Sequence, residues 1–99
     1  MALMEISVVP IGTPTPSIGD YIAEVVKTLE QEGAKFKLTD MGTIIEGDVE
    51  EILALARKLH ETPFKKGIQR VITTIEIDDR RDKKVSIEDK VKSVMARLK

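Results

Sequence analysis

Several residue types are absent from this 99-residue chain, and each absence excludes a class of protein. There is no cysteine, which excludes disulfide bonds, thiol chemistry and cysteine-ligated metals. Tryptophan is also absent and aromatic residues make up 3%, so the platform on which RNA-binding domains stack bases is missing. No apolar run approaches the length of a membrane span, and no basic segment followed by an apolar run opens the chain. We therefore expect a cytoplasmic protein with no membrane partner.

The chain also lacks an excess of charge of either sign. Sixteen Lys and Arg against seventeen Asp and Glu give a net charge of −1, with the two signs interspersed. Because nucleic-acid binders carry a basic patch or stripe, we expect no nucleic-acid partner. Asparagine is absent and glutamine occurs only at Gln31 and Gln69, whereas charged residues make up 33% of the chain. This combination of few thermolabile amides and many charges is typical of thermophilic proteins.

What is present fits a single domain spanning residues 1–99. A chain of this length buries roughly two-thirds of its unfolded surface, which is enough for one sheet with two or three helices. Deep internal cavities are not expected at this size. A ligand would therefore lie in a surface groove or between subunits.

Hydrophobic periodicity predicts the order β-α-β-β-α-β followed by a third helix. Strands are predicted at residues 4–10, 35–40, 43–47 and 71–77, and helices at residues 18–29, 49–59 and 87–98. Each helix has a predicted cap with an acidic partner three residues later: Ser17, Asp48 and Ser86. Gly33 and the pair Thr62–Pro63 predict the ends of the first two helices. The fold class is therefore α+β, a ferredoxin-like βαββαβ antiparallel sheet with an added C-terminal helix.

The last predicted strand is rich in β-branched residues and is expected to be well buried. It leads directly into five consecutive charges, Asp78–Asp82. Charged side chains at the end of a sheet destabilise it unless they pair or serve a function. We interpret Arg80, Arg81 and Asp82 as ion-pair partners, whereas Asp79 fits an ion pair and a ligand contact equally well.

The predicted sheet carries its two helices on one face only. Alternation assigns these residues to the covered face: Ile6, Val8, Phe36, Leu38, Ile45, Ile75 and Ile77. The other face would expose three aliphatic residues, Val9, Ile44 and Ile72, among polar ones. Because this is too much apolar surface to leave in water, we expect a partner subunit or the third helix to cover it. A homo-oligomer is the favoured interpretation.

Along the second helix, the apolar stripe is predicted to include Leu53.

Several short stretches resemble the thiamine-binding (YkoF-like) family of small ferredoxin-like proteins. The matching residues are Val9–Thr13, Met41–Thr43 with Glu46, Ile77–Asp82, Tyr21 and His60. The resemblance runs from Glu5 to about Lys92. Each stretch is weak alone, but their occurrence in this order is specific. Pro63 departs from the pattern, because family members more often keep that segment helical.

The resemblance implies a non-catalytic protein that binds thiamine or its hydroxymethylpyrimidine half near a subunit interface of a homo-oligomer, a dimer of dimers. The chain also lacks the residue patterns that catalysis needs. His60 is the only histidine, so without cysteine a zinc site is not expected. No nucleophile and base stand at a recognisable spacing. We therefore expect no enzyme activity, no cofactor and no metal.

The chemistry of such a ligand predicts its contacts. An aminopyrimidine needs an acceptor for its amino group, donors for its ring nitrogens and an apolar wall, and the thiazolium adds a positive charge. Met41 offers a polarisable surface for the ring, and Gly42 lets backbone approach closely. The predicted acceptor is Glu46 or Asp79. The predicted donors are Thr13, Ser17 and Thr43. Each also has a local interpretation, as a turn, cap, loop or ion-pair residue.

Other function classes use the same topology. An amino-acid-sensing or other small-molecule-sensing regulatory module is the main alternative, although such a module is normally fused to an enzyme. An RNA-binding domain is disfavoured by the missing aromatic platform.

Overall fold

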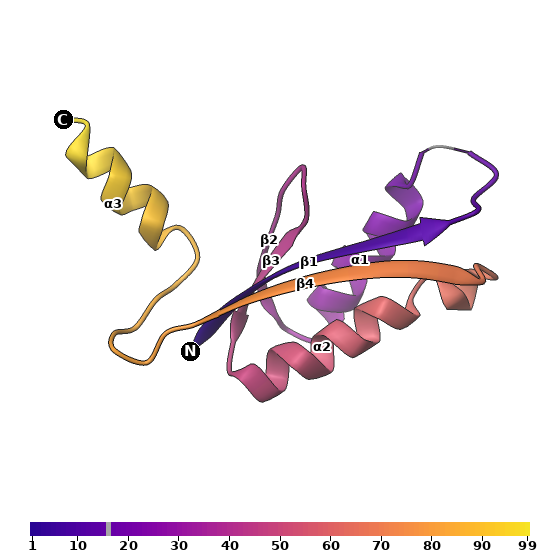
Figure 1. Cartoon of the computed structure of the whole chain (residues 1–99), viewed down its shortest axis with the longest axis horizontal. Helices are drawn as coiled ribbons and strands as arrows, with labels where there is room; N and C mark the ends of the chain where they lie inside the picture. Colours follow the sequence, from indigo (N-terminus) through magenta and orange to yellow (C-terminus); the bar gives the residue numbers. More distant parts are fainter. Residues whose placement is uncertain (16) are drawn as a thin grey trace.

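The computed structural model describes residues 1–15 and 17–99. The elements follow in the order β1 (Ala2–Ile11), α1 (Gly19–Gln31), β2 (Lys35–Leu38), β3 (Thr43–Gly47), α2 (Val49–Glu61), a 3-10 turn (Phe64–Lys66), β4 (Arg70–Asp79) and α3 (Asp89–Arg97). Figure 1 shows this arrangement. The order confirms the predicted α+β, ferredoxin-like fold with an added C-terminal helix. Within the described ranges, no helix has the length and apolar character needed to cross a bilayer.

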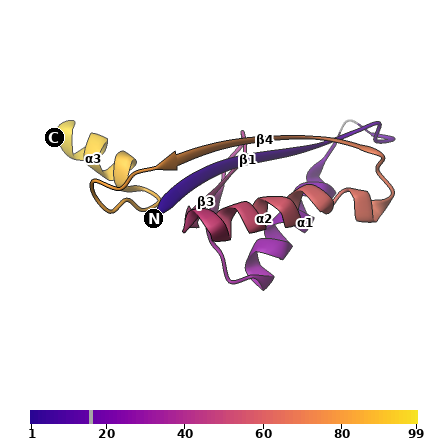
Figure 2. The same ribbon diagram turned by 60° about the horizontal axis from the view of Figure 1, so that its bottom comes forward.

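The four strands form one antiparallel sheet in the order β2-β3-β1-β4. Helices α1 and α2 both lie on the same face of the sheet, as Figure 2 shows from the side. Alternate side chains of β1 and β3 point toward these helices and form the core with the apolar stripe of each helix. The core residues are Ala2, Met4, Ile6, Val25, Leu29, Ile45, Ile52, Ala56 and Leu59. We refer to the opposite side of the sheet as the open face.

Two apolar residues predicted to lie under the helices are only half covered. Leu38 is 50% exposed and Ile75 is 41% exposed, because each lies on an edge strand, beyond the reach of the helices. Leu53 likewise lies on the outer side of α2, although it was predicted on the apolar stripe. The expectation that the last strand is well buried is therefore wrong. Strand β4 is an edge strand, and most of its side chains are exposed.

The helix ends were predicted more reliably than the helix starts. Gly33 has φ +67° just after α1, and α2 ends at Glu61, before Thr62 and Pro63. Ser17 does not cap α1, since Ile18 occupies the cap position and the Ser17 N–H donates to Thr15 Oγ1 at 3.2 Å. The first turn of α1 therefore begins without a side-chain cap.

The strands differ greatly in length, and this difference shapes the molecule. Strand β1 pairs with β4 over ten residues but with β3 only from Ala2 to Ile6. Pro10 does not end β1, contrary to expectation, because it pairs with Val71 beyond the last β3 contact. Beyond Ile6, β1 has no partner strand on the β3 side, so a proline there costs no hydrogen bond to β3. A long two-stranded ribbon of β1 and β4 thus extends past the short β2–β3 hairpin (Figure 1).

Helix α3 begins at Asp89, later than the Ser86 cap predicted. Glu88 precedes it with φ +80°, a left-handed conformation that a residue with a side chain rarely adopts. The Ser86 N–H donates to Asp89 Oδ2 at 2.8 Å, so the predicted acidic partner does bond back to Ser86, three residues earlier. Helix α3 projects beyond the end of the sheet (Figures 1 and 2). Its residues Lys90 and Val94 line a hollow with Leu3 and Asp78 at one end of the open face. The rest of that face along β1 and β4 stays exposed, including Glu5, Ile72 and Glu76.

Candidate ligand site

A hollow lies where β1 extends past β3. Its floor is the second half of β1, its wall is the first half of α1 and its rim is the turn between β2 and β3. Ile18, Ile22 and Val25 of α1 and Ile6 and Val8 of β1 make the lining largely apolar. The hollow has a volume of about 100 Å³. Pockets for drug-sized ligands usually have about 300–1,000 Å³, so this one encloses part of such a molecule.

The turn at the rim is fixed by Thr39. The Thr39 N–H donates to the Gly42 carbonyl at 2.9 Å, and the Thr39 hydroxyl donates to the same carbonyl at 2.7 Å. The Gly42 N–H donates in return to Thr39 Oγ1 at 3.2 Å. This closed set of bonds holds Asp40 and Met41 outward at the tip of the hairpin, where Met41 is 84% exposed.

Gly42 is needed at its position by the backbone of β1. A Cβ atom on Gly42 would lie 3.0 Å from the Ile6 carbonyl oxygen and 3.3 Å from Glu5 Cγ. The close approach that was predicted for this glycine is therefore made to β1. It brings the turn against the strand and sets the width of the hollow.

Polar groups stand at the mouth and floor of the hollow. The lining includes Ser7 and Thr43, and Thr43 is buried at 4% exposure. Asp40 adds a carboxylate at the exposed rim. An apolar cleft with the Thr43 hydroxyl inside and one carboxylate at the entrance suits a flat, uncharged ring joined to a cationic group.

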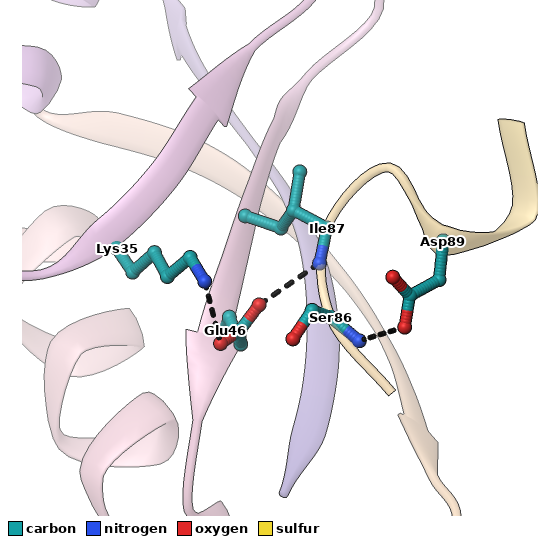
Figure 3. A network of polar contacts seen from close by, with 5 residues as sticks. All are labelled: Lys35, Glu46, Ser86, Ile87 and Asp89. Atoms are coloured by element: carbon teal, nitrogen blue, oxygen red, sulfur yellow. Dashed lines mark hydrogen bonds and ion pairs between the residues drawn. The ribbon is translucent and has the colours of Figure 1, made fainter. Parts of the chain in front are cut away.

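Glu46, a predicted ligand contact, is engaged within the chain on the open face. Its side chain is 5% exposed, and Oε2 lies 3.3 Å from Lys35 Nζ. Its Oε1 accepts a hydrogen bond from the Ile87 N–H at 2.8 Å, as Figure 3 shows. Glu46 therefore anchors the segment before α3 to the sheet.

Asp79 lies at the opposite end of the sheet from the hollow. It pairs with Ala2, whereas the hollow begins at Ile6, a separation of roughly 14 Å along β1. Arg81 Nη2 donates to Asp79 Oδ2 at 2.9 Å. This bond lowers the pKa of the Asp79 carboxyl from its ordinary value.

The remaining charges after β4 also pair locally. Arg80 donates through Nε and Nη2 to the two oxygens of Asp82, at 2.6 and 2.8 Å. This bidentate contact lowers the pKa of the Asp82 carboxyl to about 2. The interpretation of Arg80, Arg81 and Asp82 as ion-pair partners is therefore confirmed.

Thr13 and Ser17 lie in the loop before α1 and outside the lining of the hollow. The Thr13 hydroxyl donates to the Thr15 carbonyl. Of the predicted contact residues, the structure thus brings together Met41, Gly42 and Thr43. It places Thr13, Ser17, Glu46 and Asp79 elsewhere, and their contact with a ligand stays a prediction.

Sequence reasoning missed three polar residues of the hollow: Ser7, Thr39 and Asp40. The last two immediately precede Met41 in the same turn, which was an available signal. Ser7 gave no signal, because its access to the hollow depends on where β3 stops pairing with β1.

His60 lies away from the hollow, on the last turn of α2. Its Nδ1 is 2.7 Å from Thr73 Oγ1, and its ring meets the edge of Phe64 at 5.5 Å between centroids. His60 is half-buried, and the Thr73 hydroxyl occupies its ring nitrogen. Across residues 1–15 and 17–99, no group of three His, Cys, Asp or Glu side chains stands close enough to hold a metal ion.

The chain matches a known protein family along nearly its whole length. The family described as thiamine-binding protein matches residues 4–95. UPF0045 protein YqgV of Bacillus subtilis is 48% identical over 102 residues, covering 99% of this chain and 98% of the relative. The crystal structure of hypothetical protein MJ1052 from Methanocaldococcus jannaschii superimposes with a TM-score of 0.86 at 31% identity, covering 95% of each chain. A Bacillus cereus domain of unknown function gives a TM-score of 0.78 at 27% identity, covering 91% of this chain and 86% of the other. The chain therefore belongs to the thiamine-binding protein family.

Proposed function

We propose that this protein binds thiamine or its hydroxymethylpyrimidine half, without catalysis, in the hollow between β1, α1 and the β2–β3 turn. Membership of the thiamine-binding family carries the proposal. The size and chemistry of the hollow support it.

The size of the hollow favours one ring of the ligand. A dry cavity of about 150 Å³ in another protein holds benzene, so about 100 Å³ with an open mouth suits one six-membered ring. The aminopyrimidine is the flat, uncharged part of thiamine and belongs inside, against Ile18 and Ile22. The thiazolium then lies outside, beside the exposed Met41.

The polar groups match the two halves of the ligand. Thr43 carries a hydroxyl group that is able to donate to a ring nitrogen. Asp40 carries the carboxylate that accepts from the amino group or offsets the thiazolium charge. Asp40 takes this role more readily than Glu46, because both carboxylate oxygens of Glu46 have partners in the chain.

A second copy of the chain completes the site in this proposal. The part of thiamine outside the hollow would otherwise be fully solvated, which limits affinity. A homo-oligomer, assembled as a dimer of dimers, would cover the rim at Met41 and enclose the rest of the ligand.

Calorimetry with thiamine and with its separate pyrimidine and thiazole halves tests the proposal. We expect binding of thiamine and of the pyrimidine half, and no binding of the thiazole half alone. Asp40→Asn should weaken thiamine binding by about tenfold or more, as loss of a charged hydrogen bond does. Glu30→Gln, an equal change on the exposed face of α1, should leave the affinity unchanged. Absence of binding to thiamine and to its pyrimidine half at high micromolar concentration overturns the proposal, and a response to amino acids instead favours the sensing module.

A further inference from the structure

A second hollow lies between the charged end of β4, the linker that follows it and α3; we refer to it as the α3 hollow. Its volume is about 390 Å³, within the range of about 300–1,000 Å³ that holds small-molecule ligands. The least exposed residues of its lining are Leu3, Val85 and Ser86, which are half-buried. The α3 hollow shares no lining residue with the hollow at the β2–β3 turn, so a ligand in one does not displace a ligand from the other.

Positive charge is concentrated in the α3 hollow. Five cationic side chains line it against two carboxylates, a charge of +3 in a chain whose net charge is −1. The cations are Arg80, Lys83, Lys84, Lys90 and Arg97. Arg80 is already held by the bidentate contact with Asp82, which lies outside the lining. With that pair counted as neutral, an excess of two positive charges remains.

The remaining cations of the lining have no carboxylate partner. Within residues 1–15 and 17–99, no ion pair involves Lys83, Lys84, Lys90 or Arg97. The nearby Asp89 carboxylate accepts a hydrogen bond from the Ser86 N–H instead (Figure 3). A hollow lined mainly by one sign of charge raises the local concentration of ions of the opposite sign. An anion among these side chains would therefore relieve their mutual repulsion.

Helix α3 turns a polar side, and not its apolar stripe, toward the hollow. Lys90, Ser93 and Arg97 are three and four residues apart, so they lie on one side of the helix, and all three belong to the lining. Met95 and Leu98 of the apolar stripe point to a different side and are not part of the lining. The α3 hollow therefore does not depend on what contacts the apolar side of the helix.

Ser93 directs the Arg97 guanidinium along this side of α3. Arg97 Nη1 donates to Ser93 Oγ at 2.7 Å. Because Ser93 is one turn closer to the start of the helix, this bond brings the guanidinium toward Lys90. In the described parts of the chain, Arg97 Nε and Nη2 make no hydrogen bond. Two parallel N–H groups of a guanidinium are the donors that bind a phosphate in bidentate fashion.

We propose that the α3 hollow binds a small organic phosphate monoester. The phosphate lies between Lys84, Lys90 and Arg97. The organic part lies on Leu3 and Val94, which are apolar residues of the same lining. A phosphate monoester carries a charge of about −1.5 to −2 at pH 7, which matches the excess of two positive charges.

The charge of the rest of the chain favours a small ligand. Outside the α3 hollow the chain is net negative, so a long polyanion would be repelled beyond the hollow. The proposal does not rest on the binding of thiamine at the β2–β3 turn, because the two hollows differ in place and in charge.

Two ligands with the same ring test the charge requirement. Phenyl phosphate carries close to two negative charges at pH 7, whereas benzenesulfonate carries a single one. We expect phenyl phosphate to have a dissociation constant lower by about tenfold or more, as one further charged hydrogen bond provides. In amide NMR spectra it should shift the resonances of residues 83–97 and leave those of Met41–Thr43 unchanged.

Paired variants of α3 test the position of the site. Lys90→Gln with Arg97→Gln removes two charges from the hollow and should weaken phenyl phosphate binding by about tenfold or more. Lys92→Gln with Lys99→Gln, the control, removes two charges at the same spacing from the opposite side of the helix, and should change the affinity by less than about twofold. Because glutamine, lysine and arginine have similar helix propensities, both variants should keep α3 folded.

Lys83→Gln with Lys84→Gln repeats the test from the linker, so the expected loss of affinity there cannot come from unfolding of α3. Equal losses in the α3 variant and its control, or no binding of phenyl phosphate at low millimolar concentration, overturns the proposal. Binding of a single-stranded RNA oligonucleotide without binding of phenyl phosphate would assign the cations to a nucleic acid and also overturn it. Failure of thiamine to bind would leave these outcomes unchanged, because the ligand and the shifted resonances are different.

Discussion

Replacing Gly42 with alanine tests how the hollow is built. The added Cβ would lie 3.0 Å from the Ile6 carbonyl oxygen, a contact with backbone that no side-chain rotation relieves. Overpacking of this kind costs about 1–3 kcal/mol. In a domain of this size each kcal/mol lowers the melting temperature by about 4–8 °C. The turn must also move away from β1, so the affinity for thiamine should fall together with stability.

Gly19→Ala is the matched control. An added Cβ there meets only Ser17 Oγ at 4.0 Å, and Gly19 is the first residue of α1. Alanine at such a site stabilises by about 0.4–1 kcal/mol. Urea unfolding of both variants at one protein concentration measures the difference, since the stability of an oligomer depends on concentration. If Gly42→Ala proves as stable as Gly19→Ala, the turn does not approach β1 as described.

Three further predictions concern the core, the linker and the charged segment. Ile52→Ala should cost about 2–5 kcal/mol in urea unfolding because Ile52 is fully buried, whereas Leu53→Ala should cost about 0.5 kcal/mol, and equal costs would contradict the assigned face of α2. Glu46→Ala should speed hydrogen exchange of the Ile87 amide by tenfold or more, about the loss of one charged hydrogen bond, and unchanged protection would refute the anchor. The Asp82 carboxyl should titrate near pH 2 by NMR at low salt, below its ordinary 3.8, so its stabilising pair is complete above about pH 4 and is lost as the pH falls through 2; a midpoint at 3.8 would refute the pair.

The fold was predictable because the features that define its helices and turns act over short stretches of sequence. The apolar spacing of α1 and α2, the glycine at Gly33 and the proline at Pro63 act within a few residues, so the sequence alone reveals them. The start of α2 was predicted correctly, with Asp48 at the cap position, but the starts of α1 and α3 were missed because a cap depends on the path of the preceding loop. Ser17 has the right side chain for a cap, but Ile18 occupies the position.

The turn at the rim of the hollow was predictable for the same reason. Met41, Gly42 and Thr43 belong to one hairpin turn, and a turn is a local feature. The contributions of β1 and α1 depend on strand pairing that ends at Ile6, which is a long-range property. The hydrogen bond between Glu46 and the Ile87 N–H was not predictable from local sequence either, because the two residues are 41 positions apart.

The short strand β3 connects the hollow to the segment before α3. Thr43 at its start lines the hollow, and Glu46 near its end anchors the segment that precedes α3. The two side chains are three residues apart, roughly 10 Å along one strand. If a second copy closes the rim of the hollow, thiamine must tighten the association by the same factor by which association tightens thiamine binding. The two equilibria then have to be measured together, since either one determined alone depends on the concentration of the other component.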